Sequence, residues 1–300
     1  MTHEPPGAGV RALAPAKVNL YLHVVGRRSD GYHLLDSLVV FPKQGDRIAV
    51  SPAEALRLEV SGPFAADVPT GEDNLVLRAA RALAAAAGRS PVVSLRLDKC
   101  LPVASGIGGG SADAAAVLRA LTELWDLRID NDALSRIALS LGADVPMCVA
   151  SRSAYVGSIG DEMEPTPPLP DFAVVLANPR IPLPTPAVFK TRSGPFSAPG
   201  RFERAPADAA ELAALLGQRR NDLMPAAIAL VPAVSDVLSA LESTPGVMLS
   251  RMSGSGATCF GLCPSQADAA KAAAALAAEH PGWWVTSGSV AASPDRLALT

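Results

Sequence analysis

The sequence predicts an α/β protein built in two parts. Short apolar or alternating segments, which are typical of strands, recur between alanine-rich segments with helical periodicity. Apolar residues make up 49% of the chain, which is enough for a buried core. Proline and glycine become frequent across residues 161–206, as is typical of a boundary between domains. We therefore expect one domain at 1–160 and a second at 161–300.

The first part begins with strands and continues with helices. The apolar run 18–26 predicts a buried strand, and the turn residues Asp30 and Gly31 lead into the next strand. Asn74 is a favourable N-cap, and Gly88 is a typical helix end. Further strands are expected at 46–51, 56–62 and 92–103, and helices at 74–88, 111–125 and 132–141.

The second part is rich in helices and ends in strands. Helical periodicity predicts helices at 207–217, 221–230, 232–242 and 266–280. Asn221 and Asp222 are expected to cap the helix that they begin, and we assign them no chemistry. Residues 246–263 predict two strands separated by a Gly/Ser turn, and 283–291 predict a last strand.

Charge and cysteine usage argue against several classes of protein. The net charge is −3, so the chain offers no bulk attraction to nucleic acid or to an anionic membrane surface. No apolar run reaches the length of a membrane span, and residues 1–17 lack the apolar core of a signal peptide. The 4 cysteines lack Cys-x-x-Cys spacing, which favours reduced buried thiols over disulfides or zinc ligands. We expect a soluble cytoplasmic protein.

Residues 102–118, PVASGIGGGSADAAAVL, form a glycine-rich stretch that leads into a helix. Successive glycines let backbone N–H groups point into one concavity, and a helix N-terminus adds partial positive charge. Ser111 is a candidate N-cap, and Asp113 in the first turn can cap free N–H groups. The stretch lacks the lysine of a Walker A loop and the spacing of a dinucleotide fingerprint. It predicts a phosphate-binding backbone loop, with a plain turn into a helix as the alternative.

The stretch 102–118 resembles the second motif of the GHMP kinases, which bind ATP in this loop. The other motifs of that family have counterparts at 15–24 (PAKVNLYLHV) and 251–263 (RMSGSGATCFGLC). The resemblance implies an N-terminal ATP-binding domain and a ferredoxin-like C-terminal domain, with the active site between them. It assigns to ATP binding the residues Pro102, Ala104, Ser105, Gly106, Ile107, Gly108, Gly109, Gly110, Ser111 and Ala112.

Magnesium is expected with ATP, because the charge on the phosphates must be neutralised. The sequence does not identify the metal ligands, and Ser111 is the one candidate. Many relatives carry a second serine where this chain has Ala112, so no hydroxyl role is expected at that position.

Four further stretches resemble one branch of this family, whose substrate carries a cytidyl group. They are 27–38 (RRSDGYHLLDSL), 141–149 (LGADVPMCV), 181–189 (IPLPTPAVF) and 220–227 (RNDLMPAA). The resemblance implies phosphoryl transfer from ATP to a hydroxyl of a cytidyl-linked small molecule. A family member that acts on mevalonate or homoserine is the alternative, and the GYH and PTPAVF residues argue against it.

Lys17 and Asp144 are the catalytic candidates. Phosphoryl transfer needs a poised hydroxyl, and a carboxylate within hydrogen-bond reach can accept its proton. Asp144 precedes Pro146 on an expected turn, where capping of the turn is an equally good explanation of its position. A lysine at the start of an apolar strand is unusual unless it is paired, although it can also extend to solvent. The family motifs favour the catalytic assignment, with Lys17 beside Asp144.

The same resemblance assigns a set of residues to substrate binding. Tyr32 and Phe189 would hold the cytosine between aromatic faces, and His33 would hydrogen-bond its edge. Asn19 would bind hydroxyl groups of the substrate, and Thr185 would lie alongside. Ordinary core packing is the alternative for the two aromatic rings.

Two functions of other kinds remain open at this point. A non-catalytic nucleotide-binding module could keep the loop without the chemistry, although the presence of both Lys17 and Asp144 argues against it. A nicotinamide-dependent oxidoreductase would need the dinucleotide fingerprint that the loop lacks. The favoured hypothesis is an ATP-dependent small-molecule kinase that binds ATP and a cytidyl substrate, without nucleic acid or membrane, as a monomer or homodimer.

Overall fold

The first of two structural units contains two four-stranded sheets. The structure is a computed structural model that describes residues 9–291. One sheet has the order β1 (Val10–Pro15), β4 (Gly45–Pro52), β6 (Val93–Asp98) and β5 (Arg57–Ser61). The pair β5 and β6 is parallel, and the other neighbours are antiparallel.

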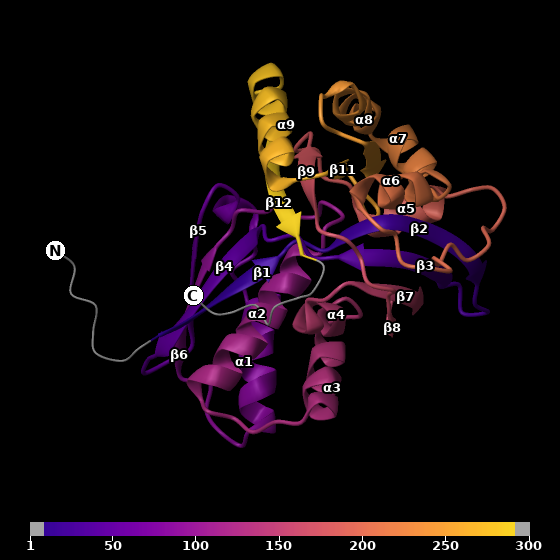
Figure 1. Cartoon of the computed structure of the whole chain (residues 1–300). Coiled ribbons are helices and arrows are strands. Elements are labelled where there is room, and N and C mark those ends of the chain that lie inside the picture. The colour runs from indigo at the N-terminus through magenta and orange to yellow at the C-terminus, as the bar shows by residue number, and fades with distance from the viewer. Residues whose placement is uncertain (1–8, 292–300) are drawn as a thin grey trace.

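The second sheet of this unit is antiparallel throughout. Its order is β2 (Val18–Arg27), β3 (His33–Val40), β7 (Ala154–Ser158) and β8 (Glu162–Pro165). The helical segments of this unit are η1 (Ala65–Asp67), α1 (Leu75–Ala86), α2 (Gly109–Leu124), α3 (Asn131–Leu141) and α4 (Val145–Ala150). Helix α2 is buried along most of its length and shares a hydrophobic core with β1, β4 and β6. Figure 1 shows α1 to α4 together on one side of the molecule.

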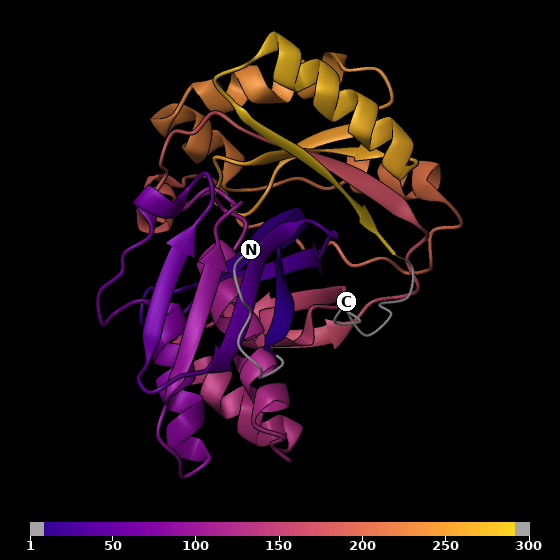
Figure 2. The same ribbon diagram turned by 90° about the vertical axis from the view of Figure 1, so that its left-hand side faces the viewer.

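The second unit has the ferredoxin-like βαββαβ arrangement that the family resemblance implies. Its antiparallel sheet has the order β10 (Leu249–Met252), β11 (Cys259–Cys263), β9 (Phe172–Asn178) and β12 (Trp284–Val290). Its helices are α5 (Thr185–Thr191), α6 (Ala209–Gly217), α7 (Met224–Leu230), α8 (Ala233–Ser243) and α9 (Gln266–Glu279). Figure 2 shows α9 running across the outer face of this sheet.

The predicted strands and helices are present, and the main differences lie where the chain turns. Helix α2 begins at Gly109, before the predicted 111, because Gly108 adopts the left-handed conformation and forms the cap. Ser111 is therefore not the N-cap. The predicted strand 92–103 ends at Asp98, and beyond it the N–H groups of Cys100 and Leu101 donate to the Asp46 carboxylate instead of to a neighbouring strand.

The proline-rich stretch 161–206 contains elements that its composition hides. Strand β8 pairs with β7 in the first unit, whereas the buried run β9 belongs to the sheet of the second unit. The chain therefore passes from one unit to the other between Pro165 and Phe172. The predicted domain boundary between residues 160 and 161 stays a prediction.

The two units share a hydrophobic core, so the walls of any cavity between them are held together. Leu20 and Leu38 of the first unit pack in one cluster with Phe260 and Leu176 of the second. Arg251, on β10, donates a hydrogen bond of 2.8 Å to the carbonyl oxygen of Leu20 on β2. Such packing favours a preformed site over one assembled by large motions of the units.

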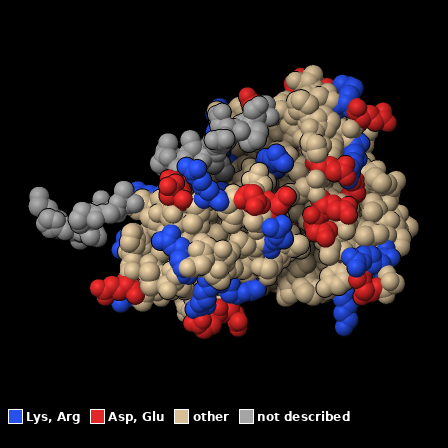
Figure 3. All heavy atoms as spheres, turned by 90° about the horizontal axis from the view of Figure 1, so that it is seen from below, with Lys and Arg blue, Asp and Glu red and all other residues tan. Residues whose placement is uncertain are grey.

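The distribution of surface charge and the state of the cysteines are as the sequence predicts. Acidic and basic side chains are interspersed on the face seen in Figure 3, so an anion site must be built locally there. All 4 cysteines are free, with Cys148, Cys259 and Cys263 buried and Cys100 half-buried. Among the described residues no helix is long and apolar enough to cross a membrane. Residues 1–8, which are part of the segment judged to lack a signal peptide, lie outside the described residues.

Candidate active site

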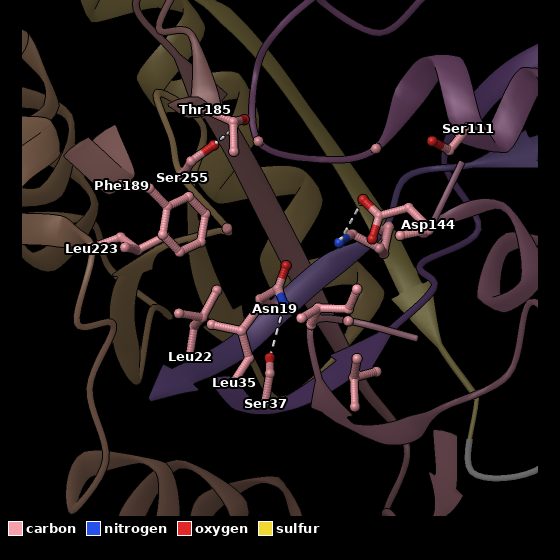
Figure 4. A pocket seen from close by; sticks show the side chains of 18 of the residues that line it. Asn19, Leu22, Leu35, Ser37, Ser111, Asp144, Thr185, Phe189, Leu223 and Ser255 are labelled. Carbon is pink, nitrogen blue, oxygen red and sulfur yellow. Dashed lines mark hydrogen bonds and ion pairs between the residues drawn. The ribbon is translucent and has the colours of Figure 1, made fainter. Parts of the chain in front are cut away.

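A cavity of about 990 Å³ opens between the two units. Its walls come from β2, the glycine-rich loop before α2, the start of α4, helix α5 and the turn between β10 and β11. Figure 4 shows that side chains from these distant segments point toward one common space. A cavity of this size between rigid elements is typical of a small-molecule site.

The glycine-rich loop forms one wall of the cavity. Gly108 has φ +64° and caps α2 without any side-chain hydrogen bond to the first turn. The free N–H groups of that turn and the helix dipole therefore favour an anion. The loop residues that line the cavity are Ala104, Ser105, Gly106, Gly108, Gly109, Gly110 and Ser111.

Pro102, Ile107 and Ala112 are buried and do not line the cavity. Ile107 acts through its backbone, because its carbonyl oxygen accepts a 2.9 Å hydrogen bond from the N–H of Lys17. This bond ties the start of β2 to the loop. Direct contact of these three residues with ATP stays a prediction.

The Gly/Ser turn of the second unit is interlocked with this loop. The N–H of Thr258 donates to the carbonyl oxygen of Ser105 at 3.1 Å, and the hydroxyl of Ser253 donates to that of Gly106 at 3.3 Å. Gly254 and Ser255 also line the cavity. The turn is therefore both a connection between strands and a part of the site.

Lys17 and Asp144 are brought together as the sequence predicts. Lys17 Nζ lies 3.2 Å from Asp144 Oδ2, and the two side chains are 11% and 39% exposed. Asp144 stands at the N-cap position of α4 but makes no side-chain hydrogen bond to that helix. The carboxylate therefore does not act as a turn cap and is directed to the lysine and the cavity (Figure 4).

The predicted substrate residues line the same cavity. They are Asn19, Tyr32, His33, Thr185 and Phe189. The ring of His33 stacks on that of Phe189, with centroids 5.2 Å apart and an interplanar angle of 26°, whereas the Tyr32 side chain is 62% exposed. The Thr185 hydroxyl lies 2.8 Å from that of Ser255.

Burial and nearby cations keep the His33 ring neutral. Desolvation, together with the positive charges of Arg27 and Arg192, lowers the pKa of His33. A neutral imidazole carries one donor and one acceptor nitrogen, and both can pair with the edge of a nucleobase. Arg27 itself lines the cavity beside His33.

A buried charge cluster lies beneath the glycine loop and was not predicted from the sequence. Lys99 Nζ donates to Asp46 Oδ2 at 2.6 Å and to Asp113 Oδ2 at 2.7 Å. Asp113 is thus engaged by a lysine and does not cap the first turn of α2, contrary to the expectation. A Cβ atom on Gly109 would lie 3.0 Å from Lys99 Nζ, so the cluster directly supports the loop. The one signal of this cluster in the sequence is Lys99, a lysine directly after an alternating strand.

The Asp113 carboxyl should make the free energy of unfolding depend on pH. Burial raises the pKa of Asp113, Lys99 opposes this rise and Asp46 adds to it. The pKa of the carboxyl is thereby raised to about 8. The folded protein therefore holds a proton that the unfolded chain releases near pH 4. The contribution of this group to the free energy of unfolding is fully present below about pH 4 and is lost as the pH rises through about 8.

Denaturant unfolding at pH 5 and pH 9 tests this expectation for Asp113→Asn. The wild-type protein should lose stability between these pH values, and the variant should lose less. Asp132→Asn, at an exposed position in the first turn of α3, is the matched control and should behave as wild type. An Asp113 variant with the wild-type dependence on pH would contradict the assignment.

Asn221 is a further residue whose role the sequence did not reveal. Its side-chain Nδ2 donates hydrogen bonds of 2.8 Å to the carbonyl oxygens of both Met252 and Gly254. Its Oδ1 accepts from the N–H of Leu223. Helix α7 begins only at Met224, so Asn221 fixes the Gly/Ser turn and does not begin a helix.

The site fits a nucleotide better than a metal bound by protein alone. The glycine loop packs closely against Lys17, since a Cβ on Gly108 would lie 3.2 Å from the Lys17 Cβ, so a side chain there would disturb this lysine. Among residues 9–291 no group of three or more His, Cys, Asp or Glu side chains is placed to hold a metal ion. A Mg²⁺ ion that binds mainly to phosphate oxygens needs only one or two protein ligands.

Two family models match the chain on either side of the cavity. The model described as the GHMP kinases N terminal domain matches residues 74–152, and the one described as GHMP kinases C terminal matches residues 202–282. The first match contains the glycine loop and Asp144, and the second contains the Gly/Ser turn.

Two relatives that share one name match nearly the whole chain. The 4-diphosphocytidyl-2-C-methyl-D-erythritol kinase of Paramagnetospirillum magneticum is 56% identical over 91% of this chain and 95% of its own length. That of Rhodospirillum rubrum is 48% identical over 98% of each chain. These identities relate the two proteins to this chain along at least 91% of its length.

Solved structures show the same fold. A crystal structure of 4-(cytidine 5'-diphospho)-2C-methyl-D-erythritol kinase matches with a TM-score of 0.75 at 34% identity, over 94% of this chain and 99% of that chain. The homoserine kinase of Cytophaga hutchinsonii matches with a TM-score of 0.70 over 97% of each chain, at 18% identity. The second likeness shows the fold alone.

Proposed function

The chain belongs to the GHMP kinase family, and we infer from this membership and from the site that it is an ATP-dependent kinase of 4-diphosphocytidyl-2-C-methyl-D-erythritol. It transfers the γ-phosphoryl group of ATP to the 2-hydroxyl of that substrate, giving the 2-phosphate and ADP. The reaction belongs to the non-mevalonate route to isoprenoid precursors. The ion pair of Lys17 and Asp144, beside a helix N-terminus that has no side-chain cap, is the observation that carries the proposal.

In the proposed mechanism Asp144 accepts the proton of the attacking hydroxyl. Its carboxylate is partly open to the cavity and is not occupied by a cap. Lys17 holds the carboxylate in place and adds positive charge next to the oxygen that attacks. Because Lys17 is tied to the loop through Ile107, the base and the phosphate cradle keep a fixed separation.

The glycine loop supplies the binding site for the ATP phosphates. Its backbone N–H groups and the α2 dipole replace the basic side chains that other phosphate sites use. Mg²⁺ would supply charge neutralisation on these phosphates, and Ser111, half-buried in the first turn of α2, is the hydroxyl that would hold it. The remaining ligands would be phosphate oxygens and water.

The cytidyl group occupies the other end of the cavity in this proposal. Phe189 and His33 form a stacked pair of rings there, and Tyr32 has an exposed ring free to close over a base. Thr185 borders the space between this end and the catalytic pair. We further propose that the protein works in the cytoplasm, as a monomer or a homodimer.

An assay of ADP formation with the purified protein tests the proposed function. Turnover is expected with 4-diphosphocytidyl-2-C-methyl-D-erythritol and not with mevalonate or homoserine. The sugar alcohol phosphate without its cytidine should react at least about 100-fold less efficiently, because stacking of one base contributes about 1–3 kcal/mol and its edge contacts add to this. Activity on mevalonate with none on the cytidyl substrate would overturn the assignment.

A further inference from the structure

The side chain of Asn19 leaves one buried polar atom without a partner. Asn19 is 4% exposed and lines the cavity. Its Nδ2 donates to the hydroxyl oxygen of Ser37 at 2.7 Å, but its Oδ1 has no hydrogen-bond partner among the described residues. Figure 4 shows this oxygen on the side of the amide that faces away from Ser37, toward the space beside Asp144. An unpaired buried acceptor is unfavourable unless a ligand completes it.

The orientation of this amide follows from the direction of the hydrogen bonds. The hydroxyl of Ser37 donates to the backbone carbonyl oxygen of Tyr21 at 2.5 Å, and a carbonyl oxygen can only accept. Ser37 has one proton, so its oxygen must accept from Asn19, and the amide must present its NH₂ group to it. In the flipped orientation, Asn19 Oδ1 and the Tyr21 carbonyl oxygen would compete for the one proton of Ser37. One of these two buried acceptors would then be unpaired.

An irregularity in β2 makes this arrangement possible. The pairing of β2 with β3 shifts between Asn19 and Tyr21, as at a β-bulge. Residues two positions apart normally share a face, yet here Tyr21 bonds to Asp36 at 2.8 Å and Asn19 bonds to Ser37, which lie on opposite faces of β3. The backbone N–H of Asn19 is also fixed, since it donates to the Ser253 hydroxyl oxygen at 3.1 Å.

We propose that Ser37 is a positioning residue, which holds the Asn19 amide so that its Oδ1 accepts a hydrogen bond from a hydroxyl of the methylerythritol portion of the substrate. The inference rests on the proposed function and adds a determinant of specificity to it. Because an amide oxygen only accepts, this position favours a hydroxyl donor and disfavours a phosphate or carboxylate oxygen. Ser37, itself 1% exposed, acts through Asn19.

The first test compares Ser37→Ala with Ser37→Thr. Loss of the hydroxyl lets the amide rotate, so we expect Ser37→Ala to raise KM for the cytidyl substrate about tenfold, as for one hydrogen bond, and to leave KM for ATP unchanged. Ser37→Thr keeps a hydroxyl and should restore most of the substrate affinity. An unchanged KM for the cytidyl substrate in Ser37→Ala would overturn the proposal, as would an equal rise in both KM values.

A double-mutant cycle with Asn19→Ala separates positioning from a purely structural effect. If Ser37 acts through Asn19, the loss of kcat/KM caused by Asn19→Ala should be about tenfold smaller in the Ser37→Ala background. Ser255→Ala, which removes a hydrogen bond to Thr185 in the same cavity, is the matched control and should combine additively with Asn19→Ala. Additive effects of Ser37 and Asn19 would refute the positioning role.

These measurements also distinguish failure of the inference from failure of the proposed function. If the wild-type protein phosphorylates another alcohol and not the cytidyl substrate, the proposed function falls. The same cycle measured with that alcohol would still reveal coupling between Ser37 and Asn19. Coupling in that case would contradict only the assignment of the hydroxyl to methylerythritol.

Discussion

Replacement of Asp144 by asparagine is expected to lower kcat by about 100- to 10,000-fold, the usual contribution of a general base. The substitution keeps the shape of the side chain but removes its capacity to take a proton at neutral pH. It also leaves Lys17 without its partner at 3.2 Å. KM for ATP should change by less than about threefold, because the glycine loop binds the phosphates through its backbone.

Steady-state kinetics on Asp144→Asn and Asp30→Asn provide the comparison. Asp30 is a second acidic residue of the same cavity, and it is paired with Arg28 at 2.8 Å on the exposed turn. Its replacement removes the same charge from the cavity but should leave kcat near the wild-type value. If Asp144→Asn turned over at the wild-type rate, Asp144 would not be the base and the mechanism would fall.

The elements of the fold could be predicted because each depends on its own local pattern. The buried strand β2 is a largely apolar run, and α1 has a favourable cap at Asn74 whose side chain accepts from the N–H of Val76. Strand β9 was missed for a local reason as well, since the prolines around Phe172–Asn178 dominate the composition of that stretch.

The main features of the site could be predicted, whereas its supporting contacts could not. The catalytic pair and the loop belong to motifs that are contiguous in sequence. The contacts that hold them join residues such as Asn19 and Ser253, or Lys99 and Asp46, which are far apart in the chain. Such pairs have no spacing rule, because only the three-dimensional packing brings them together.

Replacement of Gly106 by alanine is expected to impair ATP binding more than any other single glycine change in the loop. Gly106 has φ +78°, and a Cβ atom there would lie 2.6 Å from the carbonyl oxygen of Gly256 and 2.7 Å from that of Ser253. Both obstacles are backbone atoms of the Gly/Ser turn, so no side-chain rotation can relieve the contact. The two loops would have to separate, and the phosphate cradle would lose its shape.

The cost of the left-handed conformation must be distinguished from the cost of this contact. Gly88 has φ +63° but nothing within 4 Å of a Cβ position, so Gly88→Ala incurs only the conformational cost of about 1–2 kcal/mol. Gly106→Ala should destabilise the protein by more than Gly88→Ala and raise KM for ATP at least about tenfold, equivalent to 1.4 kcal/mol. Thermal unfolding and ATP titration of the two variants measure these effects.

The comparison decides whether the interlocking of the loops matters for function or only for stability. If Gly106→Ala matched Gly88→Ala in stability and kept the wild-type KM for ATP, the Gly/Ser turn would not define the cradle. If ATP affinity falls while the Gly88 variant binds normally, the second unit shapes the phosphate site through the Gly/Ser turn. The third family motif would then act by holding the second motif in place, which explains why a turn without charged side chains belongs to a kinase site.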